Sequence, residues 1–150
     1  HGVINKAFVG KSPSVILREI GVNVDESVRL VVAETDAQHQ LVWTEQLMPV
    51  MPLVRTRSAD EAIELAKAVE QGMGHTAMIH SKNLDVLSRM SREINTSIFV
   101  KNGPSLAGLG FGGEGFTSFS IASPTGEGIT SALDFARVRR CTLVDAFRIV

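Results

Sequence analysis

Histidine, cysteine and acidic side chains are the groups in this 150-residue chain that could carry out chemistry, and their spacing matches no known metal-binding motif. The four histidines lie at positions 1, 39, 75 and 80, without HExxH or any paired-ligand spacing. The single cysteine, Cys141, has no companion. Zinc sites use closely spaced histidine and cysteine ligands, so the sequence argues against a zinc site. One cysteine also excludes an internal disulfide and fits a reducing cytosol.

Cys141 follows the arginines 137, 139 and 140 and opens an apolar, strand-like tail that runs from residue 141 to residue 150. Neighbouring arginines lower the pKa of a thiol, which would make it more reactive. A small buried apolar residue is the interpretation that we favour for a cysteine in such a run. The sequence contains neither a GxSxG nor a Walker motif.

Glu45 is the acidic residue with the most distinctive setting, between Trp43 and the apolar Met-Pro run 48–52. A carboxylate here could accept hydrogen bonds from two hydroxyl groups of a ligand. It could equally be a solvated turn residue, and the residues alone leave both alternatives open.

Glycine is concentrated in one stretch, because eight of the 13 glycines lie between residues 103 and 128. Glycine costs chain entropy on folding, so such a cluster indicates that backbone approaches a ligand or another piece of backbone. Residues 108–113 match GxGxxG. We reject a dinucleotide fingerprint, since that motif needs a strand directly before it and a helix directly after it.

Apolar periodicity predicts an α/β architecture, a parallel-sheet layer with helical crossovers. Between residues 28 and 100 the predicted order is strand, strand, helix, strand, helix, strand. The predicted strands cover 28–33, 76–80, 98–100, 116–121 and 140–150, and a further one begins at Val50 or Leu53. Helices are predicted over 12–21, over 58–72, where the capping box Ser58–Glu61 opens the helix, and, as a short helix, over 130–137. Another helix begins at Ser81 or Asn83 and has Leu84, Leu87, Met90 or Ser91 and Ile94 on its inner face. Glu34 to Asp36 form a polar strand end, where open α/β sheets tend to bind ligands.

Composition describes an ordinary domain, with 44% hydrophobic residues, 21% charged residues and a net charge of −1. No basic excess indicates nucleic-acid binding. No apolar run approaches the roughly 20 residues of a membrane span. The chain begins at His1 without an initiator methionine, which suggests a piece of something longer.

Five motifs together resemble one enzyme family. They are Thr44–Val50 (TEQLMPV), Gly74–Ser81 (GHTAMIHS), Phe99–Ser105 (FVKNGPS), Gly110–Phe116 (GFGGEGF) and Cys141–Asp145 (CTLVD). In this order they resemble the C-terminal third of CoA-acylating aldehyde dehydrogenases, of the type used in ethanolamine and propanediol utilisation. The resemblance runs from about Lys6 to Val150.

The resemblance implies an enzyme that converts a short-chain aldehyde, NAD and coenzyme A into acyl-CoA and NADH through a cysteine thioester. Glu45 then matches the glutamate that binds the nicotinamide ribose. Asn102, Gly103, Pro104 and Ser105 match the region beside the substrate tunnel, as does the loop 108–113 with Gly110 and Phe111. Residues 1–150 would be the C-terminal portion of the catalytic domain.

The resemblance also implies what is missing. The family's nucleophilic cysteine and its nucleotide-binding domain lie upstream of the segment represented here, and Cys141 matches a cysteine of the terminal strand. We therefore expect no catalytic residue within this chain, cofactors bound mainly by absent parts, and no activity of the isolated chain. A non-catalytic scaffold of the same fold and another NAD(P)-dependent reductase of that fold are the alternatives.

The terminal run 141–150 matches an oligomerisation strand, so the resemblance implies a homo-oligomer. It implies neither a nucleic-acid nor a membrane partner. The expected location is the cytoplasm, inside or outside a bacterial microcompartment.

Overall fold

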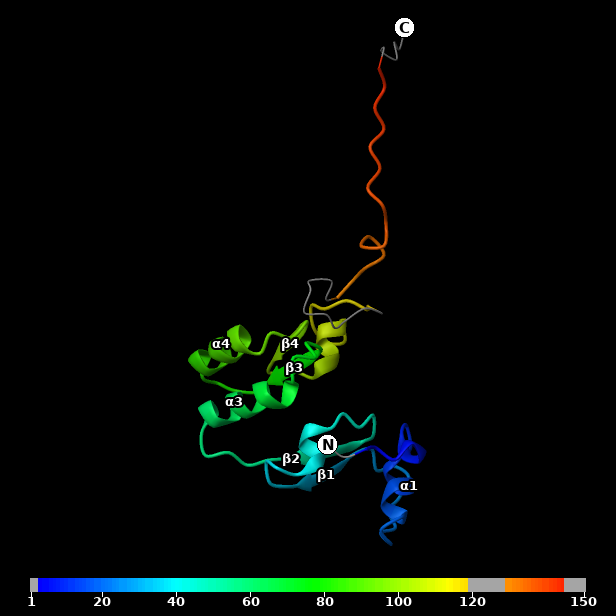
Figure 1. Ribbon diagram of the computed structural model, residues 1–150, viewed down its shortest axis with the longest axis vertical. Helices are drawn as coiled ribbons and strands as arrows, with labels where there is room; N and C mark the ends of the chain where they lie inside the picture. The colour runs from blue at the N-terminus through cyan, green and yellow to red at the C-terminus, as the bar shows by residue number, and fades with distance from the viewer. Residues whose placement is uncertain (1–2, 119–128, 145–150) are drawn as a thin grey trace. The chain divides into compact units, whose positions relative to one another are not determined.

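The computed structural model describes residues 3–118 and 129–144. The chain divides into two compact units, His1–Val69 and Glu70–Val150. Each unit is built around one pair of parallel strands (Figure 1).

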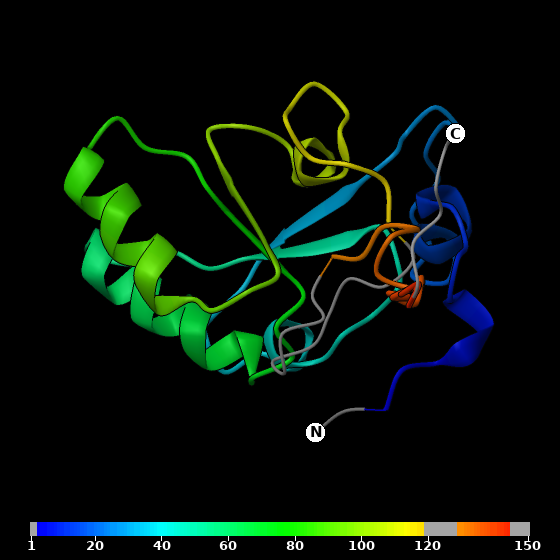
Figure 2. The same ribbon diagram turned by 90° about the horizontal axis from the view of Figure 1, so that it is seen from above.

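The first unit contains the strands β1 (Val31–Glu34) and β2 (Val50–Leu53), with Val31 beside Val50 and Glu34 beside Leu53. Figure 2 shows the two strands side by side. The other elements are the 3-10 helix η1 (Lys6–Phe8) and the helices α1 (Pro13–Arg18), α2 (Gln40–Trp43) and α3 (Ala59–Glu70), which ends at the boundary between the units. Pro13 stands at the first position of α1, where a proline costs no helical hydrogen bond.

Pro52 lies inside β2, although a proline cannot donate a ladder hydrogen bond. The Val31 amide donates to the Pro49 carbonyl (2.9 Å) and the Thr35 amide donates to the Leu53 carbonyl (2.9 Å). In a parallel ladder this alternation places the backbone nitrogen of Pro52 on the side of β2 that faces away from β1. The strand therefore begins at Val50, as the sequence allowed, and tolerates Pro52.

The second unit contains β3 (Thr76–Ile79) and β4 (Ile98–Lys101), paired in parallel with Thr76 beside Ile98. The helix α4 (Leu84–Glu93) connects them, and the 3-10 helix η2 (Ser105–Leu109) follows β4. Asn83 caps α4, because its side chain accepts hydrogen bonds from the amides of Asp85 and Val86.

The start of α3 is held by two side chains. The Ser58 hydroxyl accepts a hydrogen bond from the Glu61 amide (3.1 Å), and the Glu61 carboxylate accepts one from the Arg57 amide (2.7 Å). The latter bond is the main reason that the pKa of Glu61 lies below its ordinary value. The predicted capping box is thus present, with its return bond made to the residue before Ser58.

The α/β prediction is confirmed, and each strand and helix predicted between residues 28 and 100 is present, with parallel pairing. The short helix α2 between β1 and β2 was not predicted, β1 begins at Val31 and not at Val28, and the described strands form two separate pairs. Some details were wrong. Residues 132–135 form turns where we predicted a helix, and residues 116–118 and 140–144 are not in strands. The remainder of those two predicted strands, 119–121 and 145–150, lies outside the described residues. Leu84, expected inside, is 75% exposed.

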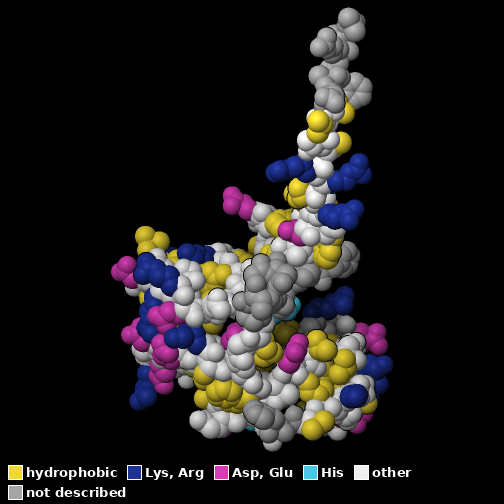
Figure 3. Space-filling model, turned by 45° about the horizontal axis from the view of Figure 1, so that its top comes forward, with side chains coloured by type: hydrophobic (Ala, Val, Ile, Leu, Met, Phe, Trp, Pro, Cys, Tyr) yellow, Lys and Arg dark blue, Asp and Glu magenta, His cyan; other side chains and the backbone are white. Residues whose placement is uncertain are grey.

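Burial differs between the units. In the second unit Leu87, Met90, Ile94, Ile98 and Val100 are all buried. Among the described residues of the first unit, the buried apolar side chains are Pro13 and Ile63, whereas the paired strand residues Val32 and Met51 are 54% and 44% exposed. Parallel sheets normally have both faces covered. On the face in Figure 3, hydrophobic side chains lie exposed among interleaved acidic and basic ones.

No helix in residues 3–118 and 129–144 is both long and apolar enough to cross a membrane.

Candidate functional site

Glu45 lies in the connection between α2 and β2, and its side chain is exposed. The helix before it is fixed at its start by His39, whose Nδ1 accepts a hydrogen bond from the Leu41 amide (3.3 Å). The Trp43 indole N–H donates to the Ala37 carbonyl (2.6 Å), which holds the helix against the preceding turn. Glu45 therefore exposes its carboxylate to solvent directly after a short helix that these two hydrogen bonds fix in place.

The residues after Glu45 anchor this position from within. The Gln46 Nε2 group donates to the Leu41 carbonyl (2.8 Å), which closes residues 41–46 into a loop. Leu47 has a φ of 50°, a left-handed conformation that is unfavourable for leucine, and it is 69% exposed. Its carbonyl accepts a hydrogen bond from the Gly10 amide (3.1 Å), so a distant part of the chain supports the conformation. We call residues 44–49 the Glu45 stretch.

Gln46 differs from its exposed neighbours because it is only 8% exposed. Its Oε1 atom is buried and has no hydrogen-bond partner among the described residues, a property shared there with the Thr35 hydroxyl. Gln46 lines a cavity of about 160 Å³ together with Val3, Ile4, Leu41 and Met48. Buried polar atoms are almost always hydrogen-bonded in folded proteins, so this acceptor is exceptional.

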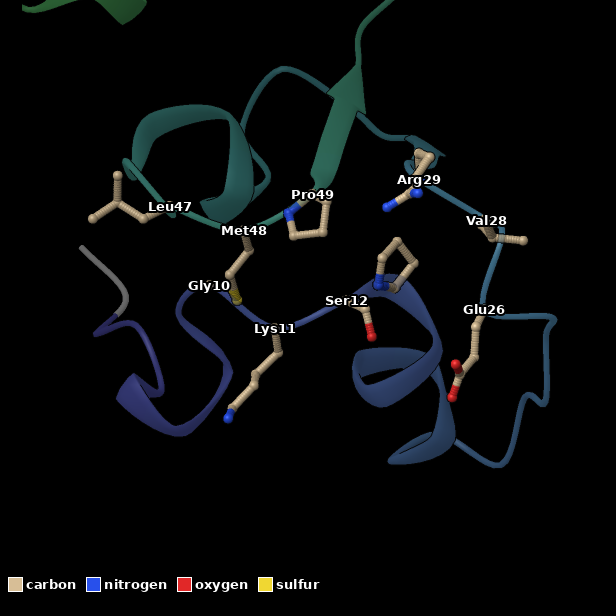
Figure 4. A pocket seen from close by; sticks show the side chains of 10 residues that line it. Gly10, Lys11, Ser12, Glu26, Val28, Arg29, Leu47, Met48 and Pro49 are labelled. Carbon is tan, nitrogen blue, oxygen red and sulfur yellow. The ribbon is translucent and has the colours of Figure 1, made fainter.

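A larger hollow of about 530 Å³ is also lined by Met48 and is bounded by the start of α1, residues 26–29 and Leu47. Figure 4 shows Arg29 reaching toward Pro49, while the Lys11 ammonium and the Glu26 carboxylate point outward. These charged groups do not converge on one point, so we assign no ligand to this hollow.

The polar end of β1, a predicted ligand position, is occupied by internal bonds. Arg55 donates two hydrogen bonds to the Glu34 carboxylate, at 2.6 and 2.9 Å, and these bonds raise the pKa of Arg55. Asp36 accepts a hydrogen bond from the Gln38 amide (2.8 Å). These carboxylates therefore hold the strand ends and the following turn together.

Asn102, a predicted substrate-tunnel residue, uses its whole side chain to extend the β3–β4 pair. Its Oδ1 accepts from the Ser81 amide (2.8 Å), and its Nδ2 donates to the Ser81 carbonyl (3.0 Å). Its own amide donates to the Ile79 carbonyl (2.8 Å). Asn102 has a φ of 56°, a conformation that asparagine tolerates better than most residues. We call these contacts the Asn102 clamp.

The other predicted tunnel residues of the second unit follow the clamp. Gly103 lines a hollow of about 460 Å³, together with Asn102, Lys101 and Glu114. Pro104 precedes η2, Ser105 opens it and Gly110 ends it, while Phe111 is 73% exposed. The structure thus gathers Asn102, Gly103, Pro104, Ser105, Gly110 and Phe111 into one connected loop.

The glycines of this loop are explained by backbone packing. A Cβ on Gly108 would overlap the Ile98 side chain, and a Cβ on Gly115 would overlap the backbone of Gly108. Gly110 has a φ of 96°, and the Gly115 amide donates to the Ala107 carbonyl (3.2 Å). Of the two explanations that the sequence offered, the one visible here is backbone approaching backbone.

The rejected dinucleotide fingerprint is also absent in structure. Six residues, 102–107, separate the end of β4 at Lys101 from Gly108, and residues 114–118 after Gly113 are not helical. Within the described residues, no three histidine, cysteine or acidic side chains form a group that could hold a metal ion. Cys141 is exposed, so our prediction that it is buried was wrong for this structure.

Sequence reasoning missed Gln46 and the structural use of Asn102. Gln46 follows an acidic residue in a polar stretch, and nothing in that pattern distinguishes it from a solvated residue. A sequence signal for Asn102 was available, because an asparagine directly before glycine often adopts a left-handed conformation.

The aldehyde dehydrogenase family model matches residues 28–135. The chain is 52% identical over 149 residues to an acetylating acetaldehyde dehydrogenase of Salmonella typhimurium, covering 99% of this chain and 32% of that protein. It is also 52% identical over 150 residues to a CoA-propanoylating propanal dehydrogenase of the same organism, again covering 99% and 32%. The chain therefore spans about a third of the length of these relatives.

Solved structures give the same picture. A propionaldehyde dehydrogenase of Rhodopseudomonas palustris with bound CoA and an acylated cysteine matches with a TM-score of 0.85 and 47% identity, over 94% of this chain and 34% of that one. A propionaldehyde dehydrogenase from the fucose-utilisation microcompartment of Clostridium phytofermentans matches at 0.85 and 45%, over 97% and 33%. An engineered glycolyl-CoA reductase with bound NADP+ matches at 0.85 and 46%, over 94% and 33%.

Proposed function

Because the chain belongs to the aldehyde dehydrogenase family, we propose that it is the C-terminal third of a CoA-acylating aldehyde dehydrogenase. The complete enzyme would oxidise a short-chain aldehyde with NAD and CoA, giving acyl-CoA, NADH and a proton. The observation that carries this proposal is the 52% identity, over almost the whole chain, to acetylating and propanoylating dehydrogenases that are three times longer.

In this proposal Glu45 binds the hydroxyl groups of the nicotinamide ribose. It is exposed, and the loop that carries it is closed by the Gln46–Leu41 hydrogen bond and supported at Leu47 by Gly10. A carboxylate has two acceptor oxygens, which suits two neighbouring hydroxyls. The cysteine nucleophile and the dinucleotide-binding domain would come from the absent part, so the isolated 150-residue chain is expected to be inactive.

The Asn102 clamp and the loop after it would form one wall beside the substrate. The clamp fixes the point where the loop leaves β4, and the packed glycines fix its path up to Phe111. A rigid wall can position a small aldehyde, because placement errors of even 1 Å are costly in catalysis.

The test is a chimera in which this chain replaces the corresponding C-terminal third of the Salmonella propanal dehydrogenase. We expect CoA-dependent NADH formation with propanal or acetaldehyde. The same dehydrogenase lacking its C-terminal third is the control and should be inactive. A folded chimera that binds NAD and CoA without forming acyl-CoA would favour a non-catalytic scaffold.

The cofactor is proposed to be NAD, with NADP as the alternative because a similar structure contains NADP+. A reductase that acts on acyl-CoA is the second candidate, since that same similar structure is a glycolyl-CoA reductase. Rates of the chimera and of the intact enzyme in both directions, with each nucleotide, distinguish these candidates.

Assembly and location also belong to the proposal. The tail 141–150 is apolar on both faces, and an exposed strand of that kind pairs readily with another chain. We therefore propose a homo-oligomer of the intact enzyme, assembled through this tail, which sedimentation of a form lacking residues 141–150 would test. A cytoplasmic enzyme, enclosed in a bacterial microcompartment like the Clostridium phytofermentans relative, is consistent with the similarity.

A further inference from the structure

Gln46 carries a buried hydrogen-bond acceptor for which the described chain provides no donor. The side chain is 8% exposed, and its amide nitrogen is already bound to the Leu41 carbonyl at 2.8 Å. Leaving such a group unsatisfied is costly, so an acceptor in this position is expected to meet a donor in the complete protein.

The cavity beside Gln46 limits what that donor can be. Its volume is about 160 Å³, whereas pockets for whole drug-sized ligands and cofactors measure about 300–1,000 Å³. Ile4, Leu41 and Met48 give it apolar walls, and no charged side chain lines it. It therefore suits a small neutral group with an N–H or O–H, such as a peptide group or an uncharged side chain.

The position of the cavity indicates where this group comes from. Val3, Ile4 and Asn5 line it, so the described part of the chain begins at its rim. Val3 itself is 95% exposed, which leaves an apolar side chain uncovered there. The relatives are three times as long as this chain, so ample polypeptide exists to cover the rim.

We propose that Gln46 is a positioning residue whose Oε1 accepts a hydrogen bond from the enzyme polypeptide upstream of Val3, seated in the cavity between Ile4 and Met48. This inference rests on the proposed function, because it requires that the chain be part of a longer dehydrogenase. Gln46 then binds on two sides, to Leu41 through nitrogen and to the upstream polypeptide through oxygen.

The consequence concerns the neighbouring carboxylate. Glu45 and Gln46 are adjacent, and the loop that carries both is closed by the Gln46–Leu41 bond. Fixing Gln46 to the rest of the enzyme therefore fixes where Glu45 stands relative to parts of the enzyme outside this chain. Those parts hold the dinucleotide in our proposed function.

The experiment uses the intact enzyme and the variant Gln46→Met, which keeps the length of the side chain and removes both hydrogen bonds. Gln40→Met is the matched control, because Gln40 lines the same cavity but is exposed. Hydrogen–deuterium exchange is measured on peptides upstream of Val3, together with the dissociation constant for NAD and the rate of acyl transfer to CoA. Gln46→Asn, which keeps the amide but withdraws it, is used if the methionine variant does not fold.

We expect one upstream peptide to exchange about five- to tenfold faster in Gln46→Met, the range for losing one hydrogen bond of a buried group. NAD affinity should fall several-fold, whereas acyl transfer should change less than twofold. Gln40→Met should leave all three quantities unchanged.

Two results would overturn the inference. If NAD affinity falls while no upstream peptide exchanges faster, Gln46 acts only through its own bond to Leu41, and no upstream polypeptide binds its oxygen. If Gln46→Met behaves like Gln40→Met, Gln46 has no role beyond its own loop. Both results require an active enzyme, so they are distinct from failure of the proposed function, in which the intact enzyme forms no acyl-CoA at all.

Discussion

The Glu45 stretch and the glycine loop after β4 are held in opposite ways. The glycine loop packs on itself, with Gly115 against the backbone of Gly108 and with Asn102 bonded to Ser81 on both amide atoms. The Glu45 stretch leaves Glu45 exposed, Gln46 with an unpartnered oxygen and Leu47 in an unfavourable conformation. The conformation of Leu47 is supported by a hydrogen bond from the amide of Gly10, which lies 37 positions earlier in the sequence.

This difference shows which type of sequence signal marks an interaction site. A concentration of glycine indicates close approach of backbone, and in this loop the close approach is internal. Unsatisfied groups and strained residues indicate that a partner is expected, because their cost is tolerated only where something offsets it. By that criterion the Glu45 stretch, with far fewer sequence peculiarities, is the stronger candidate for binding.

The largest effect should come from breaking the packing of the glycine loop with Gly115→Ala. The added methyl group would overlap the Gly108 carbonyl, so backbone must shift, and overpacking of this kind costs about 1–3 kcal/mol. Denaturant unfolding of the intact enzyme, followed by circular dichroism, measures the loss. Gly112→Asn is the control, since a side chain there meets open space and asparagine tolerates its φ of 69°. Equal stability of the two variants would show that the loop does not depend on this contact.

The second effect concerns binding by the Glu45 stretch. Glu45→Gln keeps the size of the side chain and removes the charge that strengthens bonds to ribose hydroxyls. Hydrogen bonds to charged groups contribute about 1.5–3 kcal/mol, so the dissociation constant for NAD should rise by about tenfold or more. Acyl transfer from a preformed thioester to CoA should change less. Equilibrium binding and single-turnover hydride transfer in the intact enzyme provide the measurements.

A matched substitution guards the interpretation of that result. Glu19→Gln removes an exposed carboxylate of the same unit at the end of α1 and should leave NAD binding unchanged. If Glu45→Gln also leaves NAD binding and hydride transfer unchanged, Glu45 is a solvated turn residue, and the contrast between the two loops loses its functional meaning.

A smaller effect is expected at the Asn102 clamp. Asn102→Gly preserves freedom to adopt the φ of 56° but removes both bonds to Ser81. Exposed neutral hydrogen bonds contribute about 0.5–1.5 kcal/mol, so unfolding free energy should fall by about 1 kcal/mol. Asn102→Ala should cost more, because it adds backbone strain to the same loss. If Asn102→Gly lowers the unfolding free energy as much as Asn102→Ala does, backbone strain contributes nothing and the clamp stabilises the enzyme through its two hydrogen bonds alone.

The smallest effect, with the opposite sign, is predicted at Leu47. Leu47→Asn places a residue that tolerates left-handed backbone at a φ of 50° and should stabilise the enzyme by about 0.5–1 kcal/mol. Thermal unfolding would detect it as a small rise in the midpoint. If the substitution destabilises instead, Leu47 makes apolar contacts in the intact enzyme that outweigh its strain.

The elements of this fold were largely predictable because their signals are local. Ser58 and Glu61 predict the start of helix α3, and Asn83 predicts the start of α4. A run of apolar residues predicts β1. All three elements lie close to their expected positions. The predicted inner face of α4 succeeded at Leu87, Met90 and Ile94. It failed at Leu84, because helical periodicity does not show which turns of a helix are covered by the rest of the protein and which are exposed.

The candidate site was less predictable because its contacts are not local. The resemblance supplied Glu45 and the residues 102–111, but the Gln46–Leu41 and Gly10–Leu47 bonds depend on how the chain turns back on itself. The use of glycine as packing, with Gly108 against Ile98, likewise depends on which strand the loop lies over. The concentration of glycine could indicate that the backbone of this loop approaches something closely, but it could not identify the partner as Ile98 or as the loop's own backbone.

Pro52 disfavours the addition of a foreign strand to the sheet of the first unit. Its nitrogen faces away from β1, so the outer side of β2 lacks a donor in the middle of a four-residue strand. A stray strand that added to this side would forfeit a central bond of its ladder, and prolines at sheet edges are one of the means by which proteins discourage such growth. While the chain is being synthesised or is separated from its neighbours, its short sheet is thereby a poor template for aggregation on that side.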